Sequence, residues 1–195
     1  MVSLERALYR SPRRRGIDLL ALGQGETVLD VGCGTGLSFG WLHAAVGASG
    51  RIVGVDSSAT MLDRAARRAR RHGWSNVTLI HAEADRLTAA LLDSGIDGSA
   101  VHAVLAAYAL SVMARWEDAW EQITSLAPGT RVAVVDLGVA SGAGAVLNPL
   151  WRLLCALGGS DPARRTDRRA AGDLAGGHWE RRLGGHVAVV EGTLK

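Results

Sequence analysis

Short apolar runs alternate with longer amphipathic stretches along most of the chain, and glycine, proline or polar residues separate one from the next. The short runs have the length of strands and are apolar at nearly every position, which is typical of parallel strands buried on both faces. The longer stretches have polar, arginine-rich faces, as helices on a protein surface do. The alternation predicts an α/β fold: a doubly wound, Rossmann-like and mostly parallel sheet of about seven strands, with helices on both faces.

The expected parallel strands are five runs, at residues 27–31, 51–55, 77–81, 103–107 and 131–136. Helices are expected over residues 37–46, from a cap at Ser57 or Ser58 to His72, and over 87–92, 116–126 and 148–157. At the start of the chain, residues 4–22 predict a helix that Pro12 breaks into two.

The end of the chain departs from the alternation. Residues 137–148 are rich in glycine and alanine and predict a loop, and residues 163–174 are polar and rich in arginine. Two apolar-alternating runs, 179–183 and 186–191, flank a Gly-Gly pair, which predicts a β-hairpin and an antiparallel edge of the sheet. We expect a single domain over residues 1–195, in which residues 1–24 form a helical lid.

Composition narrows the class of protein. A hydrophobic content of 48% excludes a disordered chain, and no apolar stretch approaches the ~20 residues of a membrane-spanning helix. The first ten residues carry charge where a secretory signal would be apolar, so we expect a cytoplasmic protein. Cys33 and Cys155 form no Cys-x-x-Cys pair, so neither a disulfide framework nor a metal site is expected.

The net charge is +3, and arginine supplies every positive side chain except Lys195. Clusters such as 64–71 and 164–169 suit phosphates or anionic lipid, but they equally suit solvated helix faces. No aromatic residues interleave them as in single-strand binders, which favours the solvated faces, and no nucleic-acid partner is expected.

Residues 28–36 read VLDVGCGTG, so a buried strand runs directly into glycines 32, 34 and 36, and a helix follows. Glycine lets the backbone approach a ligand closely, and a helix N-terminus presents unpaired N–H groups. Asp56 ends the next strand, where a carboxylate can accept hydrogen bonds from both hydroxyls of a ribose. These features predict a site for a nucleoside-containing cofactor.

The glycine spacing G-x-G-x-G differs from the G-x-G-x-x-G of dinucleotide-binding proteins, which speaks against a nicotinamide dehydrogenase. It resembles class I S-adenosylmethionine-dependent methyltransferases of the type 11/25 group. Further segments resemble that family in the same order: GVDSSATML, AEADRL, LAPGTRVAVVD and the final GGHVAVVEGTLK. The resemblance covers nearly the whole chain and implies S-adenosylmethionine as cofactor and S-adenosylhomocysteine as product.

The resemblance also implies roles for individual residues. Gly32, Cys33 and Gly34 would lie beside the methionine part of the cofactor, Asp30 would hold its amino group through water, and Asp56 would bind the ribose. The full implied cofactor set is Asp30, Gly32, Cys33, Gly34, Gly36, Asp56, Ser57, Met61, Glu83, Ala84 and Ala106.

Within that set, Ser57 and Met61 would border the adenosine, and Ala106 would offer its carbonyl to the methionine amine. Glu83 matches the acid that contacts the adenine amino group, and Ala84 would offer its N–H to the ring. Three positions depart from the family pattern. Glu83 stands where Asp is commoner, and Thr130 replaces the second glycine of a Pro-Gly-Gly turn. His102 stands where an Asp often opens the fourth strand.

The implied reaction is transfer of a methyl group to a nitrogen or oxygen of a small molecule. Tyr108 and Asp136 follow the fourth and fifth expected strands, where this fold places substrate contacts, and they are the candidate acceptor contacts. No general base is evident, because any single histidine here is more often structural. Residues 106–109 read AAYA and lack the NPPY or DPPY of methyltransferases that modify nucleic-acid bases.

Two alternatives remain at this point. The segments GWSNVTLI and YALSVM are similar to a branch with phospholipid and betaine-lipid N-methyltransferases, which implies a lipid or amphiphilic amine acceptor and peripheral lipid contact. A non-catalytic S-adenosylmethionine-binding module would carry the same motif. The sequence predicts no oligomeric state.

Overall fold

The computed structural model describes residues 2–140, 145–146, 148–157, 161, 164 and 166–195. Within them one seven-stranded sheet has the order β3-β2-β1-β4-β5-β7-β6. The strands are β1 (Thr27–Val31), β2 (Arg51–Asp56), β3 (Val77–His81), β4 (Ala103–Ala107), β5 (Arg131–Leu137), β6 (Ala175–Arg182) and β7 (Val187–Thr193). The first five pair in parallel, whereas β7 runs antiparallel to both β5 and β6. The predicted fold class, with its antiparallel C-terminal hairpin, is confirmed.

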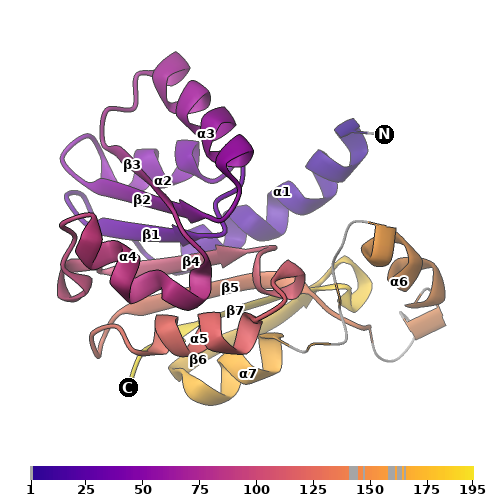
Figure 1. Cartoon of the computed structure of the whole chain (residues 1–195). Helices are drawn as coiled ribbons and strands as arrows, with labels where there is room; N and C mark the ends of the chain where they lie inside the picture. Colours follow the sequence, from indigo (N-terminus) through magenta and orange to yellow (C-terminus); the bar gives the residue numbers. More distant parts are fainter. Residues whose placement is uncertain (1, 141–144, 147, 158–160, 162–163, 165) are drawn as a thin grey trace.

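Helices cover both faces of this sheet (Figure 1). They are α1 (Val2–Leu19), α2 (Phe39–Val46), α3 (Ala59–His72), α4 (Leu87–Asp93), α5 (Trp116–Thr124), α6 (Asn148–Leu157) and α7 (Thr166–Asp173). Alternate side chains of each strand enter opposite cores. Val28 and Leu105 pack with Ile17 of α1 and Leu42 of α2 in one core. The other core contains Trp120 of α5 and the strand side chains that point to the opposite face, such as Leu29 and Val104.

The N-terminal helix differs from the prediction. Pro12 lies inside α1 and does not break it, and α1 ends at Leu19 rather than at Gly23. Proline costs a helix one hydrogen bond, but Ile17 is buried against the sheet and compensates that loss. Gly16 allows the close docking, because a Cβ atom there would overlap a methyl group of Val135 in β5.

Other boundaries shift by a few residues. The second helix begins at Phe39 rather than 37, and the hairpin's first strand begins at Ala175 rather than 179. Ser58 is the residue that caps α3, accepting a hydrogen bond from the N–H of Met61 at 3.4 Å. The predicted loop 137–148 lies partly outside the described residues. Among the described helices, none is long and apolar enough to cross a membrane.

Candidate functional site

The turn after β1 places backbone N–H groups and open space at the carboxyl edge of the sheet. Gly32, Gly34 and Gly36 all have positive φ angles, of 67°, 55° and 70°. A Cβ atom at Gly32 would lie 2.6 Å from Cβ of Ala109, so only glycine fits there. At Gly34 a Cβ atom would meet nothing within 4 Å, which shows that this residue faces open space.

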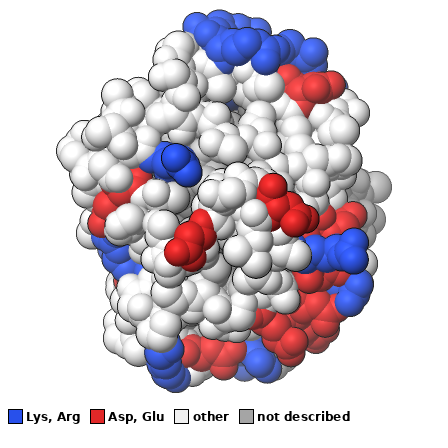
Figure 2. All heavy atoms as spheres, turned by 60° about the vertical axis from the view of Figure 1, so that its left-hand side comes forward, with Lys and Arg blue, Asp and Glu red and all other residues white. Residues whose placement is uncertain are grey.

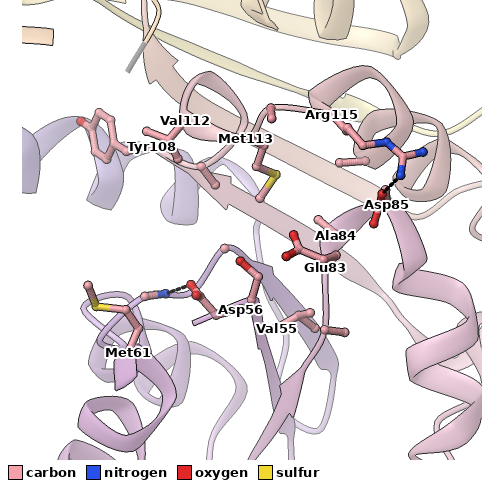
Figure 3. Close-up of a pocket in the computed structure, with 17 residues that line it drawn as sticks. Val55, Asp56, Met61, Glu83, Ala84, Asp85, Tyr108, Val112, Met113 and Arg115 are labelled. Atoms are coloured by element: carbon pink, nitrogen blue, oxygen red, sulfur yellow. Dashed lines mark hydrogen bonds and ion pairs between the residues drawn. The ribbon is translucent and has the colours of Figure 1, made fainter. Parts of the chain in front are cut away.

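Asp56 joins this turn to the end of β2. One carboxylate oxygen accepts the N–H of Gly34 at 2.8 Å, and the other accepts the N–H of Ser58 at 2.9 Å. Figure 3 shows the carboxylate at the floor of a cavity, beside Val55 and across from Glu83. Both oxygens have a lone pair left, so Asp56 orders two loops and can still accept hydrogen bonds from a ligand.

The cavity has a volume of about 630 Å³ and opens between the ends of β1, β2, β3 and β4. Eight of the residues expected from the sequence line it: Gly32, Gly34, Asp56, Ser57, Met61, Glu83, Ala84 and Tyr108. Their distant sequence positions meet here because parallel strands place all their carboxyl ends at one edge. The volume lies within the ~300–1,000 Å³ range of small-molecule and cofactor sites.

The opposite wall was not expected from the sequence. Val112 and Met113 lie across the cavity from Asp56 and Met61 (Figure 3), and Val112 is 45% exposed in the protein without a ligand. At one end Arg115 forms an ion pair with Asp85, with 2.6 Å between the nitrogen and the oxygen. The segment YALSVM contains Val112 and Met113, but nothing in its residue types indicates that they line a cavity.

Four residues of the expected cofactor set lie outside the lining. Asp30 is 1% exposed beneath the glycine turn, Ala106 is buried in β4, and Gly36 packs against the ring of Phe39. The Cys33 thiol is directed into the core near Gly54 rather than into the cavity, and burial raises its pKa. Cys33 therefore contributes its backbone to the turn and a small apolar side chain to the core.

Asp136, an expected acceptor contact, is 1% exposed and also lies outside the lining. Its oxygens accept the N–H of Ser111 at 2.8 Å, the N–H of Leu137 at 2.8 Å and the hydroxyl of Thr166 at 3.2 Å. Burial raises its pKa, which these hydrogen bonds partly oppose. Asp136 thus fastens the loop after β4 and the start of α7 to the end of β5.

Tyr108, the other expected acceptor contact, borders the cavity in a left-handed conformation with φ of 58°. Its hydroxyl donates to the carbonyl of Tyr9 at 3.2 Å, and the guanidinium of Arg13 lies 5.3 Å from the centre of its ring. Positive φ in a non-glycine residue costs ~1–3 kcal/mol and clusters at functional sites. The conformation holds the ring against α1, beside the cavity.

Arg13 also interacts with a buried carboxylate, that of Asp30. Each of these two residues has a buried polar atom, Nε and Oδ2, without a hydrogen-bond partner among the described residues. Burial raises the pKa of Asp30 to about 7, against the lowering effects of Arg13 and of a hydrogen bond from Ser38. Unpartnered buried groups of this kind call for a ligand or water.

A doubly wound sheet with a glycine turn after β1 and a bridging carboxylate after β2 defines a nucleoside-cofactor protein of the Rossmann-like class. The comparison with protein families then names the group. The family model described as "Methyltransferase domain" matches residues 28–129, and the chain belongs to this family.

Individual relatives agree with the assignment. The chain is 38% identical over 97 residues to an uncharacterized 37.1 kDa protein in transposon TN4556 of Streptomyces fradiae, covering 49% of this chain and 27% of that protein. It is 33% identical over 64 residues to the protein-L-isoaspartate O-methyltransferase of Methanococcoides burtonii, covering 33% and 32%. The matches thus span about a quarter to a third of the length of these relatives.

Solved structures share the fold. A SAM-dependent methyltransferase from Aquifex aeolicus superposes with a TM-score of 0.69 at 17% identity, over 99% of this chain and 94% of that one. The chain therefore carries a methyltransferase domain on a Rossmann-like fold. Other relatives are named for different acceptors, including a 23S rRNA uracil methyltransferase and an aklanonic acid methyltransferase, so family membership leaves the acceptor open.

The residues present fit S-adenosylmethionine. Asp56 supplies acceptors for a ribose diol, and Arg13 and Asp30 offer charges opposite to those of an amino acid's carboxylate and ammonium groups. Met61, Val112 and Met113 supply apolar surface for a purine. The open space beside the backbone of Gly34 would leave room for the cofactor.

Proposed function

We propose that this methyltransferase methylates a nitrogen or oxygen of a small molecule, in a single domain that α1 covers as a lid. The observation that carries the proposal is that α1 covers Tyr108. Tyr9 and Arg13 of α1 both contact this residue, which borders the cavity at the end of β4. A roofed site at that position suits a compact acceptor.

The distribution of charge supports the same acceptor class. Figure 2 shows basic side chains gathered over α3 at the top of the view, whereas both signs mix over the rest of that face. The exposed arginines 64, 67, 70 and 71 lie in the later part of α3, away from the first turn that borders the cavity. Arg115, the arginine that lines the cavity, is paired with Asp85 and Asp118. A nucleic-acid substrate would favour a continuous row of basic side chains that leads into the cavity. Among the described residues, no such row connects α3 with the cavity.

Each part of the cavity has a proposed task. Arg13 binds the carboxylate at the methionine end and Asp30 the ammonium group through water, while Asp56 binds the ribose. Ser57, Met61, Glu83 and Ala84 surround the adenosine. When bound, S-adenosylmethionine supplies a methyl group that positively charged sulfur makes reactive. Val112 and Met113 exclude water, and this positioning accounts for the rate increase, for which ~7–11 kcal/mol is attainable.

The test is calorimetric titration with S-adenosylmethionine, S-adenosylhomocysteine and NADH, followed by measurement of S-adenosylhomocysteine release with pools of small amines, phenols and acids. We expect micromolar binding of both sulfur ligands, none of NADH, and turnover with at least one small-molecule pool. Binding without turnover in any pool would favour the non-catalytic module. Turnover only with phosphatidylethanolamine vesicles or only with RNA would replace the small-molecule acceptor.

The pH dependence of cofactor binding tests the task of Asp30. Because the folded pKa of Asp30 is about 7, the free protein holds a proton there at lower pH. An ammonium group nearby favours the carboxylate, so binding releases that proton. The affinity for S-adenosylhomocysteine should therefore rise with pH up to about 7, by at most about tenfold per unit, and level off above it.

The measurement is titration calorimetry from pH 5.5 to 8.5, on the natural protein and on Asp30→Asn. The asparagine variant should bind more weakly with a flat profile. Methylthioadenosine lacks the ammonium group, so its affinity should stay flat in both proteins. An unchanged slope in Asp30→Asn would show that another group releases the proton.

A further inference from the structure

Four aromatic side chains, one of which is Tyr108, form a continuous cluster. The rings of Tyr108 and Tyr9 lie 4.9 Å apart, Tyr9 and Trp151 6.4 Å, and Trp151 and His186 4.5 Å, measured between ring centres. These four residues are named the aromatic cluster below. They come from α1, the end of β4, α6 and the residue before β7, so each depends on a different part of the fold.

Hydrogen bonds of the backbone and of Asn148 hold β7 and α6 at the carboxyl edge of the sheet. The N–H of Gly138 donates to the carbonyl of His186 at 2.9 Å, which places His186 beside the carboxyl end of β5. The amide of Asn148, the first residue of α6, pairs with both the N–H and the carbonyl of Ala140, at 3.1 and 2.9 Å. Trp151 follows three residues later and thus packs over His186. In this fold acceptors bind outside the carboxyl ends of the strands.

Two members of the aromatic cluster carry buried nitrogens that lack a partner in the described part of the chain. Nε1 of Trp151 and both ring nitrogens of His186 are buried without a hydrogen-bond partner among the described residues, and His186 is only 4% exposed. Native proteins pair the great majority of such atoms, and exceptions call for an explanation. Of these four residues, Tyr108 also lines the cofactor cavity, so a ligand that reaches past Tyr108 would be the missing partner.

We propose that the aromatic cluster is the acceptor site and takes a flat aromatic compound that carries both a hydroxyl group and a carbonyl oxygen. This inference rests on the proposed function and specifies its acceptor. The rings provide planar apolar surface for stacking. Trp151 offers one N–H donor, and neutral His186 offers one donor and one acceptor. A carbonyl oxygen and a hydroxyl group together satisfy that set.

The charges near the aromatic cluster argue against a cationic amine. Burial lowers the pKa of His186, so its ring is neutral near pH 7, and the guanidinium of Arg13 lies over Tyr108. Asp136, the nearby carboxylate at the end of β5, is already held by Ser111, Leu137 and Thr166. An ammonium group would thus meet a positive charge and find Asp136 engaged, while Asp30 is assigned to the ammonium group of the cofactor. An un-ionised phenol meets donors and an acceptor.

The test uses umbelliferone, which carries a hydroxyl and a lactone carbonyl, and coumarin, which lacks the hydroxyl. Each is titrated into the full chain saturated with S-adenosylhomocysteine, at a pH where the phenol is un-ionised. We expect umbelliferone to bind at least about tenfold more tightly than coumarin, because the phenol pairs with a buried group. Trp151→Phe should weaken umbelliferone about tenfold. Trp74→Phe, at the distant end of α3, should not.

His186→Leu separates ligand recognition from folding. Removing a buried polar group that lacks a partner relieves a desolvation cost, so the ligand-free variant should melt at the same temperature or about 2–4 °C higher. It should bind umbelliferone about tenfold more weakly and coumarin unchanged. A structural histidine would instead lower the melting temperature and weaken both compounds equally.

Three results would overturn the proposal: no umbelliferone binding to the loaded protein, equal binding of umbelliferone and coumarin, or normal umbelliferone binding by both variants. Binding of phosphatidylethanolamine vesicles in place of umbelliferone would also overturn the proposal and would indicate a lipid amine as the acceptor. Because S-adenosylhomocysteine binding is measured first, each of these failures is distinguishable from failure of the cofactor site itself.

Discussion

Replacing Arg13 with methionine is expected to weaken S-adenosylhomocysteine binding by about 10- to 100-fold and to leave methylthioadenosine binding unchanged. Arg13 has a buried Nε that finds no hydrogen-bond partner within the described ranges, and it lies within electrostatic reach of Asp30. A carboxylate would pair with that guanidinium in a charge-assisted hydrogen bond, worth roughly 1.5–3 kcal/mol. Methylthioadenosine has the adenosine and the sulfur but no amino acid end, so the variant removes nothing that it uses.

Calorimetry on the two ligands checks this, with Arg14→Met as the matched control. Arg14 is the next residue of α1, exposed and paired with Asp18 at 3.0 Å, and its replacement should change neither affinity. Lysine at position 13 should recover only part of the loss, because an ammonium lacks the two-pronged geometry of guanidinium. Equal losses for both ligands would mean that the variant undocks α1, and no loss for either would remove Arg13 from the site.

The fold was predictable because its signal is local and repeated. Apolar runs such as 103–107 have the length of buried strands, and glycine, proline or polar residues separate most of them from the helices between. The predicted helix break at Pro12 was wrong because the signal of a proline is local, whereas packing against the sheet is not. Proline predicts a break from local chemistry, whereas the docking of Gly16 and Ile17 on the sheet decides the outcome. Tertiary packing thus overrides a local rule where a helix buries its face.

The residues of the site also fall into those that local motifs predict and those that only tertiary packing brings together. Asp56, Gly32 and Gly34 belong to motifs with fixed spacing, and the structure places these three around one cavity. Arg13, Trp151 and His186 carry no local signal, because only the docking of α1, α6 and β7 brings them to the carboxyl edge. Asp136 shows the converse: its position after a strand suggested an acceptor contact, but backbone N–H groups and burial occupy its oxygens.

The second large effect is expected at Asp56. Changing it to alanine should weaken S-adenosylhomocysteine and methylthioadenosine alike, by about 100-fold or more, because both ligands contain the ribose. Unpaired ribose hydroxyls account for ~1–3 kcal/mol. The N–H groups of Gly34 and Ser58 lose their acceptor in the same step, so the turn that shapes the cavity loosens as well.

Calorimetry with both ligands measures the loss, and a melting curve shows that the variant is folded. Asp56→Asn keeps one acceptor oxygen and should fall between the alanine variant and the natural protein. Asp63→Ala, an exposed carboxylate on α3, is the control and should bind normally. Unchanged affinity in Asp56→Ala would refute the ribose assignment. Since Asp56 and Arg13 act on opposite ends of the ligand, their losses should multiply for S-adenosylhomocysteine and reduce to that of Asp56 alone for methylthioadenosine.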